Sequence, residues 1–244
     1  MNLILFQPDE TAKPLPRSDQ RALHVLDVLK RGNGDTFDVG IVDGPRGKAT
    51  LLEVGRDTLT FSFTWGLPPP PLDPITLIVG LPRPQTARKI LQDATAVGVS
   101  SLHFVLTDRT EPSYAQSTLW SSGEWRRHLI AGAEQAFCTR LPAVTWTSTL
   151  ADRLSNLPHT AGRVALDNYE GVMPLLAYSV DGYNPASPPE MALAIGAERG
   201  WSDEERHALR QQGFTLAHLG ERVLRTETAV IAALAILKAK LGQI

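Results

Sequence analysis

The stretch from Leu219 to Leu237 reads LGERVLRTETAVIAALAIL and decides the fold of the C-terminal part of the chain. A short apolar run before it, Phe214 to Leu219, predicts a buried strand. A helix is predicted to open at Thr226, which can serve as its N-cap, with the negative charge of Glu227 in the first turn. Two lysines and a glycine follow the apolar residues, as is typical of a helix C-terminus. The loop between this strand and helix can present backbone N–H and C=O groups to a ligand.

A second block lies upstream, from Leu193 to Glu205, and reads LAIGAERGWSDEE. Either block alone is typical of an ordinary strand–turn–helix unit of an α/β protein. Together and in this order, they resemble the signatures of the RsmE family, the bacterial 16S rRNA uridine-N3 methyltransferases of the SPOUT (trefoil-knot) superfamily. Further matches, including an EQ-x-x-x-x-R-x-P run from Glu134 to Pro142, extend the resemblance over essentially the whole chain.

Length and composition favour an ordinary globular protein. The chain has 244 residues, 43% hydrophobic and 20% charged, which fits one large domain or two modest ones. Its formal net charge is −2, so a positive surface for RNA must be local. Cys138 is the single cysteine, which excludes an intramolecular disulfide, and the six histidines show no metal-ligand spacing, so no metal is predicted. With no signal peptide and no apolar run approaching about 20 residues, we expect a cytoplasmic protein without membrane segments.

Residues 1–66 read as a small β-rich domain. Arg21 to Arg31 predicts a short helix with Leu23 and Leu26 facing inward, and Val25 and Leu29 as further candidates. The three strands expected after it are Thr36 to Val42, Lys48 to Val54 and Thr58 to Trp65, the last with one buried face.

Within that first domain, His24 to Lys30 reads HVLDVLK and resembles the PUA-like RNA-binding domain that begins RsmE proteins. The resemblance implies an RNA contact for Lys30. Asp27 stands where the family commonly has arginine, and the lost positive charge weakens the expected phosphate contact. A β-barrel core without a ligand is the alternative for this domain.

A proline-rich linker is predicted over residues 67–74, where four consecutive prolines favour a stiff extended segment. From residue 75 to 244 strands alternate with helices, which predicts an α/β domain with a mostly parallel sheet and helices on both faces. The expected strands are Ile75 to Gly80, Leu102 to Leu106, Ala143 to Trp146, Arg163 to Leu166, Met191 to Ile195 and Phe214 to Leu219. The expected helices run from Gln85 to Val97, Trp125 to Phe137, Asp203 to Gln212, and from Thr226.

The resemblance implies that the second domain is a trefoil-knotted SPOUT methyltransferase domain that binds S-adenosylmethionine (SAM) in the loops around the knot. Apolar walls and fixed backbone hydrogen bonds suit a flat adenine, and the sequence has no P-loop or G-x-G-x-x-G that would suggest a nucleotide phosphate. Carried onto this chain, the cofactor residues are Leu166, Ile195, Gly196, Gly200, Leu219, Gly220 and Leu224.

Methylation of uridine N3 needs a proton acceptor, and positive charge beside the carbonyl oxygens where negative charge gathers. We assign Arg225 to that charge and Glu227 or Glu198 to the proton. The alternative is that Glu227 caps its helix and Arg225 pairs with it.

The family match also implies RNA contacts for Arg83, Arg109 and Arg140, for which solvated surface arginine is the alternative. It implies a homodimer as well. The apolar stripe of the last helix could pack across the two-fold axis or cover the sheet of its own chain. That stripe consists of Val230, Ala233, Leu234 and Leu237.

Departures from the family pattern leave three hypotheses. The first is a SAM-dependent methyltransferase for uridine N3 in 16S rRNA of the small ribosomal subunit. The second is a divergent SPOUT methyltransferase with another RNA target, motivated by Asp27, Asp93, Ala96 and Cys138. The third is a non-catalytic RNA-binding or ribosome-assembly protein, motivated by Ala197 in place of proline and Arg199 in place of glycine.

Overall fold

The structure is a computed structural model that describes residues 3–158, 162–180, 184 and 188–244. Its chain forms two compact units, each made of two segments. Unit 1 comprises Met1–Pro71 and Ala133–Leu141, and unit 2 comprises Leu72–Gly132 and Pro142–Ile244. Among the residues that the structure describes, no helix has the length and apolar character needed to cross a membrane.

Unit 1 is built on a five-stranded sheet in the order β1-β3-β4-β5-β2. β1 runs parallel to β3 and the other neighbours are antiparallel, so the strands predicted at 36–42 and 48–54 pair as a hairpin. The strands are β1 (Ile4–Phe6), β2 (Leu15–Pro16), β3 (Thr36–Ile41), β4 (Arg46–Val54) and β5 (Thr58–Trp65). The short helical segments are η1 (Pro8–Glu10), α1 (Gln20–Leu23) and η2 (His24–Val28).

The alternation in β5 places its large side chains on one face, as predicted. Leu59 is fully buried, and the ring of Phe63 stacks on that of Trp65 with centroids 5.1 Å apart. Phe6 from β1 meets the edge of Phe63 at 5.3 Å. These aromatic contacts close the core of unit 1 over one side of its sheet.

The helix predicted from Arg21 lies where it was expected, but one residue predicted to face inward is exposed. Leu23 is 38% exposed, whereas Val25 is buried. The cause is the wider π-type turn of η2, in which Leu29 N–H bonds to His24 C=O, five residues back. A wider turn rotates the helix face relative to the regular period that the prediction assumed.

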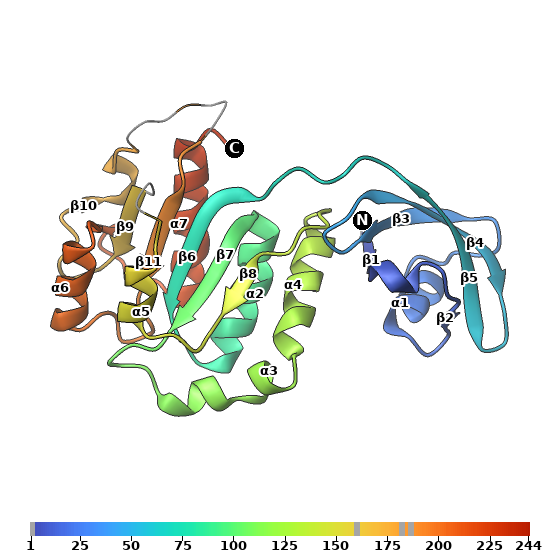
Figure 1. The fold of residues 1–244 in the computed structure, drawn as a ribbon, viewed down its shortest axis with the longest axis horizontal. Coiled ribbons are helices and arrows are strands. Elements are labelled where there is room, and N and C mark those ends of the chain that lie inside the picture. Colours follow the sequence, from blue (N-terminus) through green and yellow to red (C-terminus); the bar gives the residue numbers. More distant parts are fainter. Residues whose placement is uncertain (1–2, 159–161, 181–183, 185–187) are drawn as a thin grey trace. The chain divides into compact units, whose positions relative to one another are not determined.

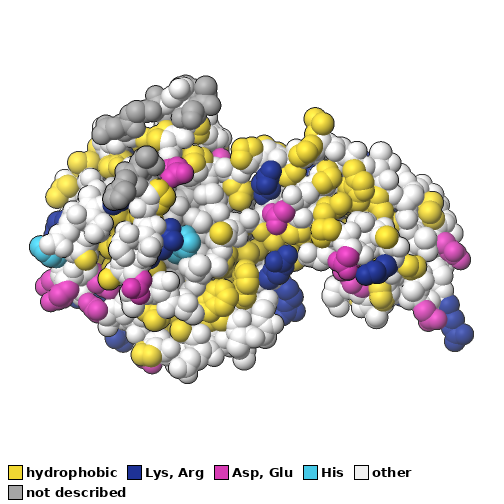
Figure 2. Space-filling model, viewed as in Figure 1, with side chains coloured by type: hydrophobic (Ala, Val, Ile, Leu, Met, Phe, Trp, Pro, Cys, Tyr) yellow, Lys and Arg dark blue, Asp and Glu magenta, His cyan; other side chains and the backbone are white. Residues whose placement is uncertain are grey.

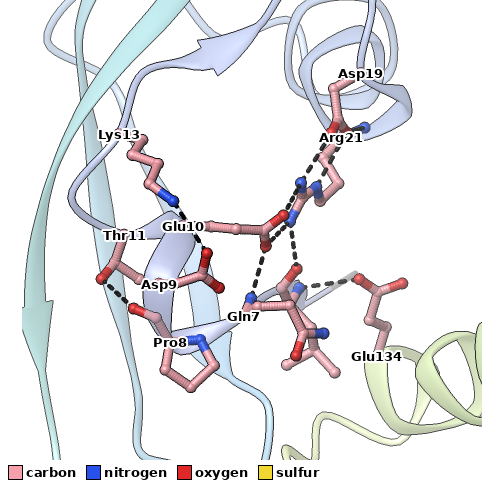
Figure 3. A network of polar contacts seen from close by, with 10 residues as sticks. Gln7, Pro8, Asp9, Glu10, Thr11, Lys13, Asp19, Arg21 and Glu134 are labelled. Atoms are coloured by element: carbon pink, nitrogen blue, oxygen red, sulfur yellow. Dashed lines mark hydrogen bonds and ion pairs between the residues drawn. The ribbon is translucent and has the colours of Figure 1, made fainter.

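A network of charged side chains ties Ala133–Leu141 to the start of the chain (Figure 3). The Arg21 guanidinium lies 2.7 Å from a Glu10 carboxylate oxygen and 2.8 Å from an Asp19 one. Glu134 accepts the Leu5 N–H at 3.0 Å, and burial raises the pKa of Glu134. Sequence analysis places this segment with the later part of the chain, but these contacts explain why it belongs to unit 1.

Unit 2 contains a seven-stranded sheet in the order β10-β12-β9-β11-β6-β7-β8. All its neighbouring strands are parallel, which confirms the predicted sheet. Only the short β10 lies outside the predicted strands. The strands are β6 (Asp73–Gly80), β7 (Val99–Val105), β8 (Ala143–Thr145), β9 (Gly162–Leu166), β10 (Met173–Pro174), β11 (Met191–Ile195) and β12 (Thr215–His218).

Helices cover both faces of this sheet: α2 and α7 pack together on one face, and α5 and α6 lie on the other (Figure 1). The core under α5 and α6 includes Leu154, Trp201 and Leu209 against Ile78 and Ala192. The helical segments are α2 (Pro84–Val97), η3 (Pro112–Gln116), α3 (Thr118–Ser121), α4 (Glu124–Gln135), α5 (Leu150–Ser155), η4 (Leu175–Ala177), α6 (Asp203–Gln211) and α7 (Thr226–Lys240).

α7 begins one residue earlier than predicted. The N-cap is Arg225, with φ −63° and ψ 150°, and Thr226 is the first helical residue and is buried, so the prediction of Thr226 as the cap was wrong. The apolar stripe of α7 is fully buried within its own chain. Of the two alternatives for that stripe, the structure therefore favours covering the sheet of the same chain.

His103 in β7 gives unit 2 a pH-dependent stability. Burial, followed by the charge of Arg153, lowers the pKa of His103 from 6.5 to about 4. The unfolded chain takes up this proton below about pH 6.5 and the folded chain only near pH 4, so stability falls as the pH drops through that range. We expect urea unfolding at about pH 5 and about pH 7.5 to differ less in His103→Asn than in the wild type. His207→Asn, at an exposed position of α6, is the control, and an unchanged pH dependence in His103→Asn would contradict the assignment.

Candidate functional site

The carboxyl ends of β9, β11 and β12 meet at one edge of the parallel sheet. Leu166 is paired with Ile195 on one side and Ala217 on the other, so the three strands end side by side. Ligands of open α/β sheets bind at such strand ends. The loops that follow enclose what we call the first hollow. It is lined by Leu166, Asp167, Asn168, Tyr169, Ile195, Gly196, Ala197, Glu198, Arg199, Gly200, Leu219, Val223, Leu224, Thr226 and Ala229.

The first hollow brings together most of the residues that sequence analysis assigned to a cofactor, although they come from three separate loops. Gly220 is the one that does not line it; it is exposed next to Leu219 with φ 104°. Those that do are Leu166, Ile195, Gly196, Gly200, Leu219 and Leu224.

The turn after β11 is closed by two glycines that approach each other. A Cβ at Gly196 would lie 2.9 Å from the Gly200 Cα and 3.2 Å from the Trp201 N. Gly200 itself has φ 67°, the left-handed region that favours glycine. The Trp201 indole N–H donates to Leu166 C=O at 3.0 Å, which fixes this turn against the end of β9. Both glycines are therefore needed for the shape of the turn.

A buried ion pair shapes the loop after β9. One carboxylate oxygen of Asp167 accepts the N–H groups of Tyr169 and Glu170 at 2.8 and 2.6 Å. The other accepts Nε of Arg206 at 2.8 Å. The side chains of Asp167 and Arg206 are only 2% and 6% exposed. This pair is not predicted from the sequence, where the one available signal is an ionisable residue directly after a buried strand.

The S-x-x-E motif after the turn joins two loops. Ser202 and Glu205 form a capping box at the start of α6. Glu205 also accepts the Asp108 N–H at 2.9 Å, and the Ser202 hydroxyl donates to the Asp108 carboxylate. The motif therefore holds the loop after β7 against the loop after β11.

A second hollow opens on the other side of the turn at Ala197–Arg199, and we call it the arginine hollow. The Arg109 guanidinium donates to Arg199 C=O at 2.7 Å, and the Arg83 N–H donates to the Glu198 carboxylate at 3.2 Å. Two of the arginines predicted to contact RNA thus lie together. The hollow is lined by Leu81, Arg83, Asp108, Arg109, Thr110, Glu111, Tyr114, Ala197, Glu198 and Arg199.

The three residues predicted to act in catalysis also lie at this edge. Glu198 lines both hollows, and it lines a third opening together with Arg225 and Glu227. A backbone hydrogen bond at Glu227 lowers its pKa, which burial raises less strongly, and Lys89 and Arg225 lower it further. The Glu227 carboxylate lies 3.3 Å from the Lys89 ammonium. Of its two neighbouring cations, Lys89 is therefore the one that pairs with Glu227.

The other two residues predicted to contact RNA belong to unit 1. Lys30 is exposed. The Arg140 guanidinium donates to the carbonyl oxygens of Pro70 and Pro69 at 2.9 and 3.3 Å, so its donors are partly used in bracing the proline-rich segment. RNA contact by either residue stays a prediction.

Surface charge around the site is mixed. On the face shown in Figure 2, acidic side chains gather over α6, whose first turn contains Asp203 and Glu204, and Lys and Arg side chains are scattered. An acidic helix repels a phosphate backbone, so RNA would have to approach through a local basic site such as the arginine hollow. Among the residues that the structure describes, no group of three or more metal-ligating side chains lies together.

Residues 68–238 match a family model described as an RNA methyltransferase domain. The chain is 34% identical to ribosomal RNA small subunit methyltransferase E of Treponema pallidum, over 98% of this chain and 91% of that protein. It is 28% identical to ribosomal RNA small subunit methyltransferase E 1 of Borreliella burgdorferi, over 99% of both chains.

Two solved structures share the fold. A methyltransferase of Legionella pneumophila in complex with SAM has a TM-score of 0.77 at 23% identity, with 98% of this chain and 97% of that chain covered. Ribosomal RNA small subunit methyltransferase E of Neisseria gonorrhoeae bound to SAM has a TM-score of 0.73 at 21% identity, with the same coverage. From the matched family model and the Treponema relative, the chain belongs to the ribosomal RNA small subunit methyltransferase E family.

Proposed function

We propose that the protein transfers a methyl group from SAM to N3 of a uridine in 16S rRNA. The observation that carries this proposal is the first hollow, in which loops from β9, β11 and β12 converge beside the arginine hollow. Family membership supports the RNA substrate and the methyl donor.

The residues of the first hollow fit SAM. Leu166, Ile195 and Leu224 supply apolar walls of the kind that a flat adenine needs. A Cβ at Gly200 would meet no atom within 4 Å, so the backbone there faces open space. Backbone groups beside open space, between apolar walls, can hydrogen-bond to the edge of a base. When bound, SAM supplies the methyl carbon on a positively charged sulfur.

Glu198 is the better of the two candidate proton acceptors. Its carboxylate borders both hollows, so it can reach a base that lies beside the methyl donor. The lowered pKa of Glu227 makes that carboxylate a weaker base, and Lys89 holds it. We propose that Glu198 takes the N3 proton as the new N–C bond forms and the S–C bond breaks. Arg225 would stabilise the negative charge on the neighbouring carbonyl oxygens.

Two finer features of the family complete the proposal for unit 2. The first is a trefoil knot at the loops of the first hollow, supported by the position of β11 between β6 and β9 in the sheet.

The second is a homodimer. Because the apolar stripe of α7 is buried, the dimer would use the opposite face, which is free of charge between Glu227 and Lys238. The small exposed side chains of Thr228, Ala235 and Ala239 allow close packing there.

For the first part of the chain we propose a PUA-like RNA-binding domain over residues 1–66, joined through a linker at 67–74 to the methyltransferase domain at 75–244. The curled five-stranded sheet of unit 1 and exposed Lys30 support this role. Binding of small-subunit RNA by the full chain should then weaken in Lys30→Ala.

The activity is tested by incubating the full chain with SAM and small ribosomal subunits that lack the modification. N3 lies on the Watson–Crick edge of uracil, so a methyl group there stops reverse transcription at the modified base. We expect one new SAM-dependent stop in 16S rRNA, and nucleoside mass spectrometry should show N3-methyluridine. SAM binding without any methylated nucleoside would instead favour a non-catalytic RNA-binding protein.

Gly196→Ala tests the first hollow itself. The added Cβ meets the backbone of Gly200, which cannot move aside like a flexible side chain, so the turn must open. Overpacking of this kind costs about 1–3 kcal/mol, and we expect SAM affinity in calorimetry to fall about tenfold or more. Gly213→Ala is the control, since a side chain is strained there too, by the φ of 78°, but Gly213 follows α6 and does not line the hollow. Unchanged SAM affinity in Gly196→Ala would count against this site.

A further inference from the structure

One wall of the arginine hollow is the segment that follows β7, and it is fixed at its start. The Asp108 N–H donates to Glu205 at 2.9 Å, and the Arg109 guanidinium donates to Arg199 C=O at 2.7 Å. Both partners belong to the loop and helix after β11. The start of this segment is therefore held against the turn that also lines the first hollow.

The same segment is fixed again further on, at Tyr114. The Trp120 indole N–H donates to Tyr114 C=O at 3.1 Å. Trp120 is itself held, because its ring lies 5.2 Å from that of Phe104 and stacks at 5.1 Å on that of Trp146. Because both ring contacts hold the Trp120 indole in place, its hydrogen bond fixes the position of the Tyr114 backbone. A binding residue placed in this way loses little freedom when it meets a ligand.

Tyr114 also contributes its side chain to the arginine hollow. Its ring lines the arginine hollow and is half-buried. Within the described part of the chain, its hydroxyl makes no hydrogen bond and its ring pairs with no other aromatic ring. An aromatic ring that faces a hollow from a fixed stretch of backbone offers a flat apolar surface to a ligand.

The charges at the hollow restrict what that ligand is. Arg83, Arg109 and Arg199 attract an anion. The carboxylates of Asp108, Glu111 and Glu198 line the same hollow and oppose a second negative group. A nucleotide satisfies this pattern, with its phosphate on the arginines and a neutral flat base over the ring. The shared turn Ala197–Arg199 would then place the base next to the first hollow.

We propose that the arginine hollow receives the target pyrimidine after it leaves its stack in the RNA, and that Tyr114 is the surface on which this base stacks. Enzymes that modify the Watson–Crick edge of a base need the base extruded in this way, and aromatic side chains hold it. This inference rests on the proposed function.

The test compares Tyr114→Ala, Tyr114→Leu and Tyr114→Phe in the full chain. Methylation of unmodified small subunits gives kcat and KM for RNA, and calorimetry gives the Kd for SAM. Loss of one stacked base should lower kcat/KM of Tyr114→Ala about 10- to 100-fold, with the Kd for SAM unchanged. Tyr114→Leu fills similar space without a π face and should fall between. Tyr114→Phe should match the wild type, because the hydroxyl makes no hydrogen bond to any residue that the structure describes.

The outcomes separate this inference from the function on which it rests. Wild-type activity in Tyr114→Ala would overturn the stacking role alone, and so would equal losses in Tyr114→Phe and Tyr114→Ala. A weakened Kd for SAM in Tyr114→Ala would also overturn it, because the ring would then serve the cofactor. A wild-type chain that binds SAM but methylates no small-subunit RNA would remove the proposed function, and the stacking role with it. If Tyr114→Ala unfolds early on heating, Tyr114→Leu carries the comparison.

Discussion

Arg206→Leu should lower the free energy of unfolding by about 3–5 kcal/mol, the loss expected when one partner of a buried ion pair is removed. The substitution leaves the Asp167 carboxylate, 2% exposed, without its cation. Asp167 also holds the N–H groups of Tyr169 and Glu170, so the loop after β9 would lose its shape. Urea unfolding measures the stability, and calorimetry should show weaker SAM binding because this loop lines the first hollow.

Arg210→Leu is the matched control for this prediction. Arg210 lies one turn further along α6 and pairs with Glu170, but both side chains are over 40% exposed, so its loss should cost about 0–1 kcal/mol. In the double variant Asp167→Asn with Arg206→Leu, no charge is buried and the amide oxygen still accepts both N–H groups. We expect it to regain part of the stability. An Arg206→Leu chain as stable as Arg210→Leu would show that the pair is not needed.

Glu198→Gln should lower kcat for methylation by about 10²- to 10⁴-fold, the usual contribution of a positioned base. The substitution keeps the shape of the side chain and its bond from the Arg83 N–H but removes the proton acceptor. The Kd for SAM should change little, because the apolar walls and the glycines of the first hollow are untouched and the amide keeps the size of the one lining side chain that changes. Rapid-quench methylation under saturating SAM and RNA gives kcat directly.

Glu227→Gln discriminates between the two carboxylates. Glu227 pairs with Lys89 and starts α7, so its loss should slightly lower stability and leave kcat near the wild-type value. The reverse pattern, a large loss of kcat in Glu227→Gln and none in Glu198→Gln, would assign the proton to Glu227. If neither substitution lowers kcat, neither of these two carboxylates accepts the proton.

Much of unit 2 could be predicted from periodicity and turn residues. Met191–Ile195 and Asp203–Gln211 lie where the apolar run and the helix signal placed them, because both are local patterns with clear ends. Gly98 ends α2 with φ 100°, as a glycine after an amphipathic helix suggests. The three loops that enclose the first hollow could also be recognised, since each follows a strand of the same parallel sheet.

The missed features depend on partners that are distant in sequence. Nothing near Glu205 indicates that its carboxylate accepts the Asp108 N–H, 97 residues away. Glu134 likewise joins unit 1 through Leu5, 129 residues away. The burial of Arg206 was hidden because an arginine in an otherwise charged helix reads as solvent-exposed. Sequence patterns report local preference and periodicity, and tertiary contacts of this kind override or add to them.

Contacts with residues that are distant in sequence also explain how the structure accommodates the departures from the family pattern. Ala197 is buried against the end of β6, where a Cβ at Gly80 would come within 2.5 Å of its backbone nitrogen. Arg199 is exposed, and its carbonyl oxygen is the acceptor for Arg109. The turn therefore keeps its backbone role in both hollows with side chains other than proline and glycine.

A crystal structure of the full chain grown with SAM tests the central claim most directly. We expect density for the adenine between the loops that follow β9, β11 and β12, against Leu166, Ile195 and Leu224, with the methyl group toward Glu198. Density for SAM anywhere outside the first hollow, or loops too far apart to touch one ligand, would contradict it.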